Sequence, residues 1–186
     1  SEVDEVVKEI RKLVEDDERE VEKAIRDIRR SNEELRERVE RLLEELERLI
    51  KEVEETVRRM EGKEEIDKLL RELEKRARDV LRELEELLKE DEKRVKEVLD
   101  RIKKVNEDTK KRVEELLREI VRRRGEDVEA VEKARKILEE VEKVVTDTEK
   151  KLDDIRKHVK EVVDRLRKEI EDVLKRVRDV AERERR

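Results

Sequence analysis

Apolar residues recur at one fixed step along this chain, and that step restricts the possible folds more than any other feature. Between the two glycines, Gly62 and Gly125, one row of apolar residues is Ile66, Leu84, Ile102 and Ile120. Each step is eighteen residues, which is five turns of an α-helix at about 3.6 residues per turn. Before Gly62 the same step gives the row Val3, Val21, Val39 and Val57. The repeat predicts long helices that keep one apolar side without a left-handed supercoil.

Three segments carry this repeat, and the glycines separate them. We expect helices over residues 2–61, 64–124 and 127–184, all within a single domain of residues 1–186. Short connections make successive helices antiparallel. The predicted fold class is therefore all-α, an up-down-up antiparallel three-helix bundle of ~60-residue helices.

The residues next to the glycines predict how the helices end. Arg58 and Arg59 place positive charge in the last turn of the first helix, where the helix dipole favours it. Gly62 is then the expected left-handed cap residue. Ser1 and Asp127 are the expected N-caps of the first and third helices, because a short polar side chain can accept hydrogen bonds from free N–H groups there.

Composition excludes several classes of protein. Of the 186 residues, 61% are charged and 33% apolar, with no aromatic residue, no proline and no cysteine. Disorder is excluded by the sustained helical period, and a membrane span is excluded because no apolar run approaches ~20 residues. The 54 basic and 60 acidic residues are interspersed, giving a net charge of only -6. We therefore expect no nucleic-acid partner and no required partner of any kind, and no N-terminal segment indicates targeting, so localisation is unknown.

The width of the apolar stripe predicts whether the bundle is closed. An apolar fraction of 33% lies between a coiled-coil seam and a helix of a larger core. Three such stripes, with Leu42 and Val162 among their expected core residues, can cover one another with no large apolar patch left over. We expect a soluble monomer.

Some residues in the core register are polar, and only these could carry chemistry. They are Asp17, Ser31, Asn32, Thr56, Asp91, Asn106, Thr109, Thr148 and His158. Folding the chain at its two turns places position 32 opposite position 93, and position 93 opposite His158. One predicted buried polar layer therefore contains Ser31, Asn32, Asp91 and His158. A second contains Asp17, Asn106, Thr109 and Thr148.

Serine, histidine and aspartate in the first layer could suggest a nucleophilic triad. Such a triad also needs an oxyanion hole and a substrate pocket, and the helices contain no nucleophile elbow, interior glycine or aromatic lining. A metal site is weaker still, because one histidine and one nearby aspartate do not complete a tetrahedral zinc shell. We expect no catalytic, cofactor-binding or metal-binding residues, and no cofactor.

A buried hydrogen-bond network explains the same residues better. A slipped or swapped bundle would leave buried polar groups unpaired, at about 1–3 kcal/mol each. Polar core residues can thus fix helix register. In this interpretation His158 donates to Asp91, and Asn32 or Ser31 completes the layer. Thr56 has no evident partner, and we expect it to bond the carbonyl four residues earlier in its own helix.

The chain resembles de novo designed three-helix bundles. The resemblance lies in the matched helix lengths, the eighteen-residue repeat, the Leu, Ile and Val seams, the glycine turns, and the polar positions Ser31, Asn32, Asp91 and His158. It implies parametric straight helices with buried hydrogen-bond layers, a hyperstable scaffold of synthetic origin and no natural biochemical activity. The alternative is a component of a helical assembly, or a binding module, that uses an exposed helix face; the candidate residues are Leu138, Val145 and Leu174.

Overall fold

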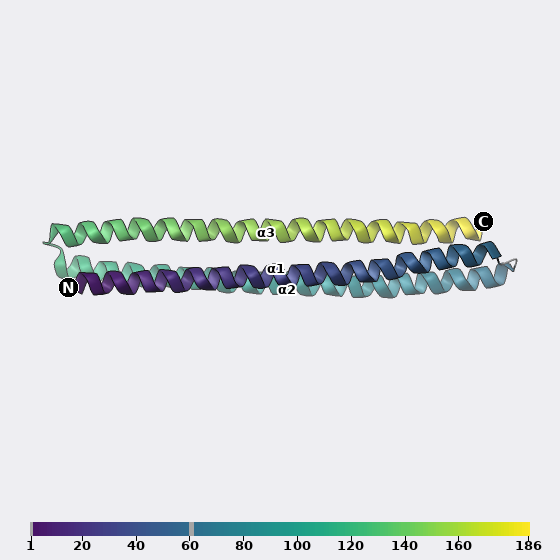
Figure 1. The fold of residues 1–186 in the computed structure, drawn as a ribbon, viewed down its shortest axis with the longest axis horizontal. Helices are drawn as coiled ribbons and strands as arrows, with labels where there is room; N and C mark the ends of the chain where they lie inside the picture. Colours follow the sequence, from purple (N-terminus) through teal and green to yellow (C-terminus); the bar gives the residue numbers. More distant parts are fainter. Residues whose placement is uncertain (1, 60–61) are drawn as a thin grey trace. The chain divides into compact units, whose positions relative to one another are not determined.

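The computed structural model describes residues 2–59 and 62–186, and every regular element in those ranges is an α-helix. Figure 1 shows α1 (Glu2–Arg59), α2 (Lys63–Arg124) and α3 (Val128–Arg185) as continuous helices. They contain 58, 62 and 58 residues, which confirms the predicted all-α fold of three long helices. Each begins with acidic residues in its first turn and ends with basic residues in its last, the charge placement that the helix dipole favours. The N-cap expected at Ser1 and the helix end expected at residue 61 lie outside the described residues.

The chain divides into two compact units, each with one segment of every helix. Unit 1 comprises Ser1–Arg29 and Arg94–Lys157, and unit 2 comprises Arg30–Lys93 and His158–Arg186. Each unit also contains one of the two turns, at Gly125 in unit 1 and at Gly62 in unit 2. The assignment of residues 1–186 to a single domain stays a prediction.

Ion pairs between helices show how the segments of unit 1 run. The α1 and α2 segments are joined by the pairs Glu2–Arg124 and Glu9–Arg112, both at 3.5 Å. Residue numbers rise along one helix as they fall along the other, so these segments are antiparallel. Lys133 of α3 lies 3.0 Å from Asp4 of α1, a separation of 129 residues along the chain. All these side chains are largely exposed, so each pair contributes about 1 kcal/mol or less.

Unit 2 shows the same arrangement. The α1 and α3 segments are joined by the pairs Glu47–Arg176, at 3.4 Å, and Glu54–Arg183, at 3.9 Å. Their numbers rise together, so these segments are parallel. The α2 and α3 segments are joined by Glu92–Arg167, at 2.9 Å, and by Glu74–Arg185, with numbers that run in opposite directions. The segments therefore alternate in direction, as an up-down-up bundle requires.

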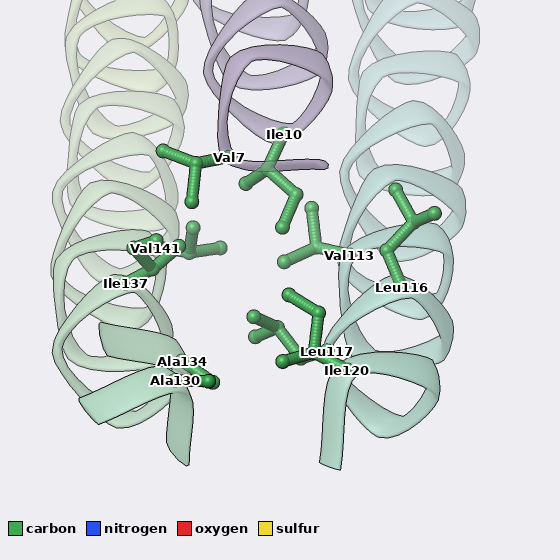
Figure 2. Packing of buried hydrophobic residues seen from close by; sticks show 10 residues of the cluster. All are labelled: Val7, Ile10, Val113, Leu116, Leu117, Ile120, Ala130, Ala134, Ile137 and Val141. Carbon is green, nitrogen blue, oxygen red and sulfur yellow. The ribbon is translucent and has the colours of Figure 1, made fainter. Parts of the chain in front are cut away.

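The buried residues follow the apolar repeat. In unit 1, side chains from all three helices form one cluster (Figure 2), which consists of Val7, Ile10, Val113, Leu116, Leu117, Ile120, Ala130, Ala134, Ile137 and Val141. In unit 2, Leu43 and Val163 are 6% and 4% exposed, while the expected core residues Leu42 and Val162 are only half-buried. The expectation was wrong at these two positions because the next residue in each case continues the i, i+4, i+7 spacing of the stripe.

Gly62 does not have the left-handed conformation that we expected for a cap, and Gly125 does not have it either. Neither has a positive φ. The Gly62 carbonyl instead accepts a hydrogen bond from the Ile66 N–H at 3.2 Å, so Gly62 is the N-cap residue of α2, which begins at Lys63. At Gly125 the requirement is space, because an added Cβ would lie 2.7 Å from the carbonyl oxygen of Val121.

Two local predictions about polar side chains are confirmed. Asp127 caps α3: its Oδ1 accepts hydrogen bonds from the N–H groups of Glu129, at 3.1 Å, and Ala130, at 3.3 Å. Thr56 donates from its Oγ1 to the carbonyl oxygen of Glu52 at 2.7 Å, the bond to its own helix that its lack of a core partner predicted.

Candidate functional site

The first polar contact in the core of unit 1 joins α1 to α2. Asp17 and Asn106 are each only 4% exposed. The oxygen and nitrogen of an amide side chain are assigned from the hydrogen bonds that each can form. With the Asn106 amide nitrogen facing Asp17, Nδ2 donates to both carboxylate oxygens, at 2.7 Å to Oδ2 and 2.8 Å to Oδ1. One amide therefore satisfies both oxygens of a buried carboxylate.

Apolar layers lie on both sides of this pair, as the helical spacing dictates. One turn away along each helix, Val21 of α1 and Ile102 of α2 belong to one buried cluster. In the other direction, Ile10 of α1 and Val113 of α2 belong to the cluster of Figure 2. The Asp17–Asn106 pair is thus a polar layer between two apolar layers of the α1–α2 seam in unit 1.

The environment of Asp17 changes how it titrates. Burial raises the pKa of Asp17 from its ordinary 3.8 to about 6, and the negative charges of Glu18 and Glu20 act in the same direction. The hydrogen bonds from Asn106 act in the opposite direction because they favour the ionised form. A neutral Asp17 can donate its own O–H to the amide oxygen of a rotated Asn106, so the pair can stay hydrogen-bonded in both protonation states.

The two threonines expected in this layer are close to the core but do not join the pair. Thr148 of α3 is 4% exposed and Thr109 of α2 is half-buried. Within the described ranges, neither hydroxyl forms a hydrogen bond with Asp17 or Asn106. Asn106 also lies at the wall of a groove of about 480 Å³ between α2 and α3, whose charged lining includes Lys103, Glu107 and Glu149.

The polar contact in unit 2 is different. Ser31 of α1 donates from its Oγ to Oδ1 of Asp91 on α2, at 3.2 Å. Asp91 is 4% exposed and Ser31 half-buried. The neighbouring Asn32 is 5% exposed, and its Oδ1 has no hydrogen-bond partner among the described residues. The structure thus brings Ser31 and Asp91 together and leaves the Asn32 carbonyl oxygen outside the contact.

His158 does not lie in the buried layer where we expected it. Its side chain is exposed, whereas Ile155 and Val159 on either side of it are 4% and 6% exposed. Folding the chain at the turns estimates the height of a residue along the bundle but not the direction in which its side chain points. Ile155 and Val159 occupy the inner positions of α3, and His158 therefore lies on another face.

These positions determine what the polar residues can do chemically. The serine, histidine and aspartate of a possible triad do not converge, since Ser31 contacts Asp91 while His158 faces solvent. No group of three or more His, Cys, Asp or Glu side chains in the described ranges is arranged to hold a metal ion. None of the described helices combines the length and apolarity needed to cross a membrane. Inter-helix hydrogen bonding is what the geometry supports.

The three residues proposed for an exposed apolar face differ in their surroundings. Leu138, Val145 and Leu174 are all half-buried, and Leu138 lines a groove between α2 and α3 beside Gly125. The sequence reasoning missed the exposed apolar member of that groove, Val121, which is 46% exposed. The sequence does contain a sign of this exposure, because Val121 directly follows the core residue Ile120 and so lies outside the regular apolar rows.

Comparisons with known proteins agree with this architecture. No protein-family model matches the chain, and no curated protein matches it. Among solved structures, the chain is similar to a protein described as a "Computationally designed three helix bundle". The TM-score is 0.68 at 20% sequence identity, over 98% of this chain and 90% of that one. The likeness shows the fold, and the expected resemblance to designed three-helix bundles is confirmed at that level.

Proposed function

We propose that this chain is a designed structural scaffold without natural biochemical activity, in which buried polar residues specify helix order and register. The observation that carries the proposal is the Asp17–Asn106 pair, a buried carboxylate whose two oxygens are both satisfied by one amide of another helix. The contact lies between apolar layers and pairs an amide donor with a carboxylate acceptor. That arrangement suits a structural role.

A bundle that slipped out of register would lose this contact. If α2 moved by one turn against α1 so that Ile102 lay level with Asp17, Asn106 would lie level with Leu13, and both polar residues would face apolar side chains. Each buried polar group left unpaired costs about 1–3 kcal/mol, and a charged group costs more. The correct register has no such penalty at this layer.

Replacing both members of the pair by leucine tests this role. The Asp17→Leu/Asn106→Leu variant should remain helical but lose its unique register, giving additional or broadened backbone amide signals in NMR spectra. A short bifunctional maleimide should cross-link Glu9→Cys to Arg112→Cys, which stand at an observed ion pair, less completely in that background. A single sharp set of signals with undiminished cross-linking would contradict the register role.

The absence of enzymatic activity is part of the same proposal. Ser31 is the only serine of the proposed layers, and its hydroxyl is engaged with Asp91. A fluorophosphonate probe should therefore leave Ser31 unlabelled in the folded protein, as mass spectrometry of the peptides would show. Labelling of Ser31 would contradict the proposal and revive a hydrolytic interpretation.

As a scaffold, the chain should be monomeric at low micromolar concentration and stay folded near the boiling point of water. Matched apolar stripes bury one another, and helix-forming residues fill the exposed positions. Light scattering should then give a mass near 22.7 kDa, and circular dichroism should retain the helical signal on heating. A larger mass at this concentration would mean that stripes are shared between chains.

A second candidate function is supported by one specific observation. The groove that contains Leu138 and Val121 is apolar and open, which a fully closed scaffold does not require. It favours a component of a helical assembly, or a binding module, that uses the exposed face of α2 and α3. An exposed apolar site is the usual mark of such a contact.

A further inference from the structure

The groove beside Gly125 lies between α2 and α3, entirely within unit 1. It encloses about 650 Å³ and has apolar walls formed by Leu117, Val121, Val131, Ala134 and Leu138. Its cause is visible in the sequence of α3, where the first two core positions are Ala130 and Ala134 and the next are Ile137 and Val141. Figure 2 shows the short alanine side chains opposite Leu117 and Ile120 of α2. Side chains this small cannot fill the space between the two helices.

The groove also leaves apolar surface in water. Val121 on its wall is 46% exposed, although it lies directly after the buried Ile120. Most of the exposed surface elsewhere on these helices is charged. Covering Val121 and the adjacent wall would be favourable in proportion to the apolar area removed from water.

Charged residues around the groove are separated by sign. The basic members, Arg118, Arg122 and Arg135, lie nearer to Gly125 along their helices than the acidic members, Glu114 and Glu142. The groove thus has an arginine end and a glutamate end. Two copies related by a twofold axis across the groove would place the arginine end of each against the glutamate end of the other. A parallel arrangement would place like charges together, which is unfavourable.

We propose that this groove binds the same groove of a second copy of the chain, in a twofold arrangement with the arginine and glutamate ends paired. The inference rests on the second candidate function above, an assembly through the exposed face of α2 and α3. A single groove is small beside the ~1,200–2,000 Å² of a stable interface. The dimer is therefore weak, with a dissociation constant on the order of 0.1 mM or weaker, and the chain is monomeric at low micromolar concentration.

Sedimentation velocity over a concentration series tests the proposal on the full chain. From ~10 µM to ~1 mM, the weight-average mass should rise from 22.7 kDa toward twice that value. The Val121→Gln variant should keep the monomer mass over the whole range. Val128→Gln is the matched control, because Val128 is a valine with 73% exposure that does not line the groove. It should associate as the wild type does.

Charge reversal tests the twofold arrangement itself. In Arg118→Glu/Arg122→Glu the groove becomes mostly acidic, and in Glu114→Arg/Glu142→Arg it becomes basic. Each variant alone should stay monomeric to ~1 mM, and an equimolar mixture should form a heterodimer at least as tight as the wild-type dimer, more so at low salt.

A wild-type mass that stays at 22.7 kDa up to ~1 mM would overturn the proposal. So would association that Val121→Gln and Val128→Gln affect equally. Both results would leave the scaffold function standing, since that function depends on a folded bundle in one register. Failure of the scaffold proposal would appear separately, in the NMR spectra and cross-linking of the doubly substituted variant.

Discussion

The two compact units use segments of the same three helices, but they treat their buried polar residues differently. In unit 1 the amide of Asn106 donates to both oxygens of Asp17. In unit 2 the hydroxyl of Ser31 donates a bond of 3.2 Å to Asp91, while the neighbouring Asn32 is buried and its Oδ1 has no partner in the part of the chain that the structure describes. We therefore expect the asparagine of unit 1 to stabilise the fold and that of unit 2 not to. A buried amide stabilises the fold only if its own hydrogen bonds are made.

The same substitution at these two asparagines should give the largest contrast. Asn106→Leu removes the amide nitrogen that donates to both oxygens of the buried Asp17 carboxylate, which should lower the free energy of unfolding by about 3 kcal/mol or more at pH 7.5. Asn32→Leu removes an amide whose oxygen already lacks a partner, so stability should stay the same or rise by about 1 kcal/mol. Guanidinium chloride unfolding measures both.

A double substitution provides the control for this contrast. Asp17→Leu/Asn106→Leu removes the carboxylate together with its donor, and most of the stability lost in Asn106→Leu should return. Equal destabilisation by Asn32→Leu and Asn106→Leu would show that the hydrogen bonds of these asparagines do not set the two units apart.

Acidification should sharpen the difference by acting on Asp17. The pKa of Asp17 in the folded chain is about 6, against an ordinary value of 3.8. Between these values the folded chain binds more protons than the unfolded chain, so stability falls as pH rises through this range. Protonation of Asp17 therefore contributes at most about 3 kcal/mol to the free energy of unfolding. This contribution is present below about pH 4 and lost above about pH 7.

The chain contains 60 acidic residues, so the effect of Asp17 must be measured as a difference between two variants. The free energy of unfolding of the wild type, relative to Asp17→Asn, should be higher at pH 4.5 than at pH 7.5. A carboxyl resonance of Asp17 that titrates near pH 4 would contradict the expectation and would mean that the hydrogen bonds from Asn106 outweigh burial.

Sequence reasoning reached most of the fold because its signals are local. The eighteen-residue step predicts each helix by itself, and Asp127 caps α3 through N–H groups two and three residues away. Short turns then set approximate heights, which is why Ser31 could be placed near Asp91. Heights do not give the direction of a side chain, and His158 is exposed for that reason. The open groove was missed because it depends on how two helices fill the space between them at Ala134.

Ser31→Ala should have a smaller effect than either change in unit 1. It removes the hydrogen bond from a half-buried hydroxyl to a buried carboxylate, so the expected loss is about 1 kcal/mol. His158→Ala is the control from the same predicted layer. Because His158 is exposed, its substitution should change stability by less than about 0.5 kcal/mol. A larger loss for His158→Ala than for Ser31→Ala would place the histidine in the layer after all.

The turns offer the smallest contrast between the units. Gly125→Ala would place a Cβ 2.7 Å from the backbone oxygen of Val121, and this oxygen belongs to helix α2 and cannot move without disturbing it. Gly62→Ala meets only the flexible side chain of Glu65 at 3.8 Å. Since neither glycine has a positive φ, alanine at position 62 should stabilise the fold by about 0.4–1 kcal/mol through a less flexible unfolded chain. At position 125 the contact should outweigh that gain and destabilise by about 1 kcal/mol. If the unfolding midpoints of both Gly62→Ala and Gly125→Ala rose, the two glycines would be equivalent. The flexibility of the unfolded chain, rather than the space around the glycine, would then determine the effect at both turns.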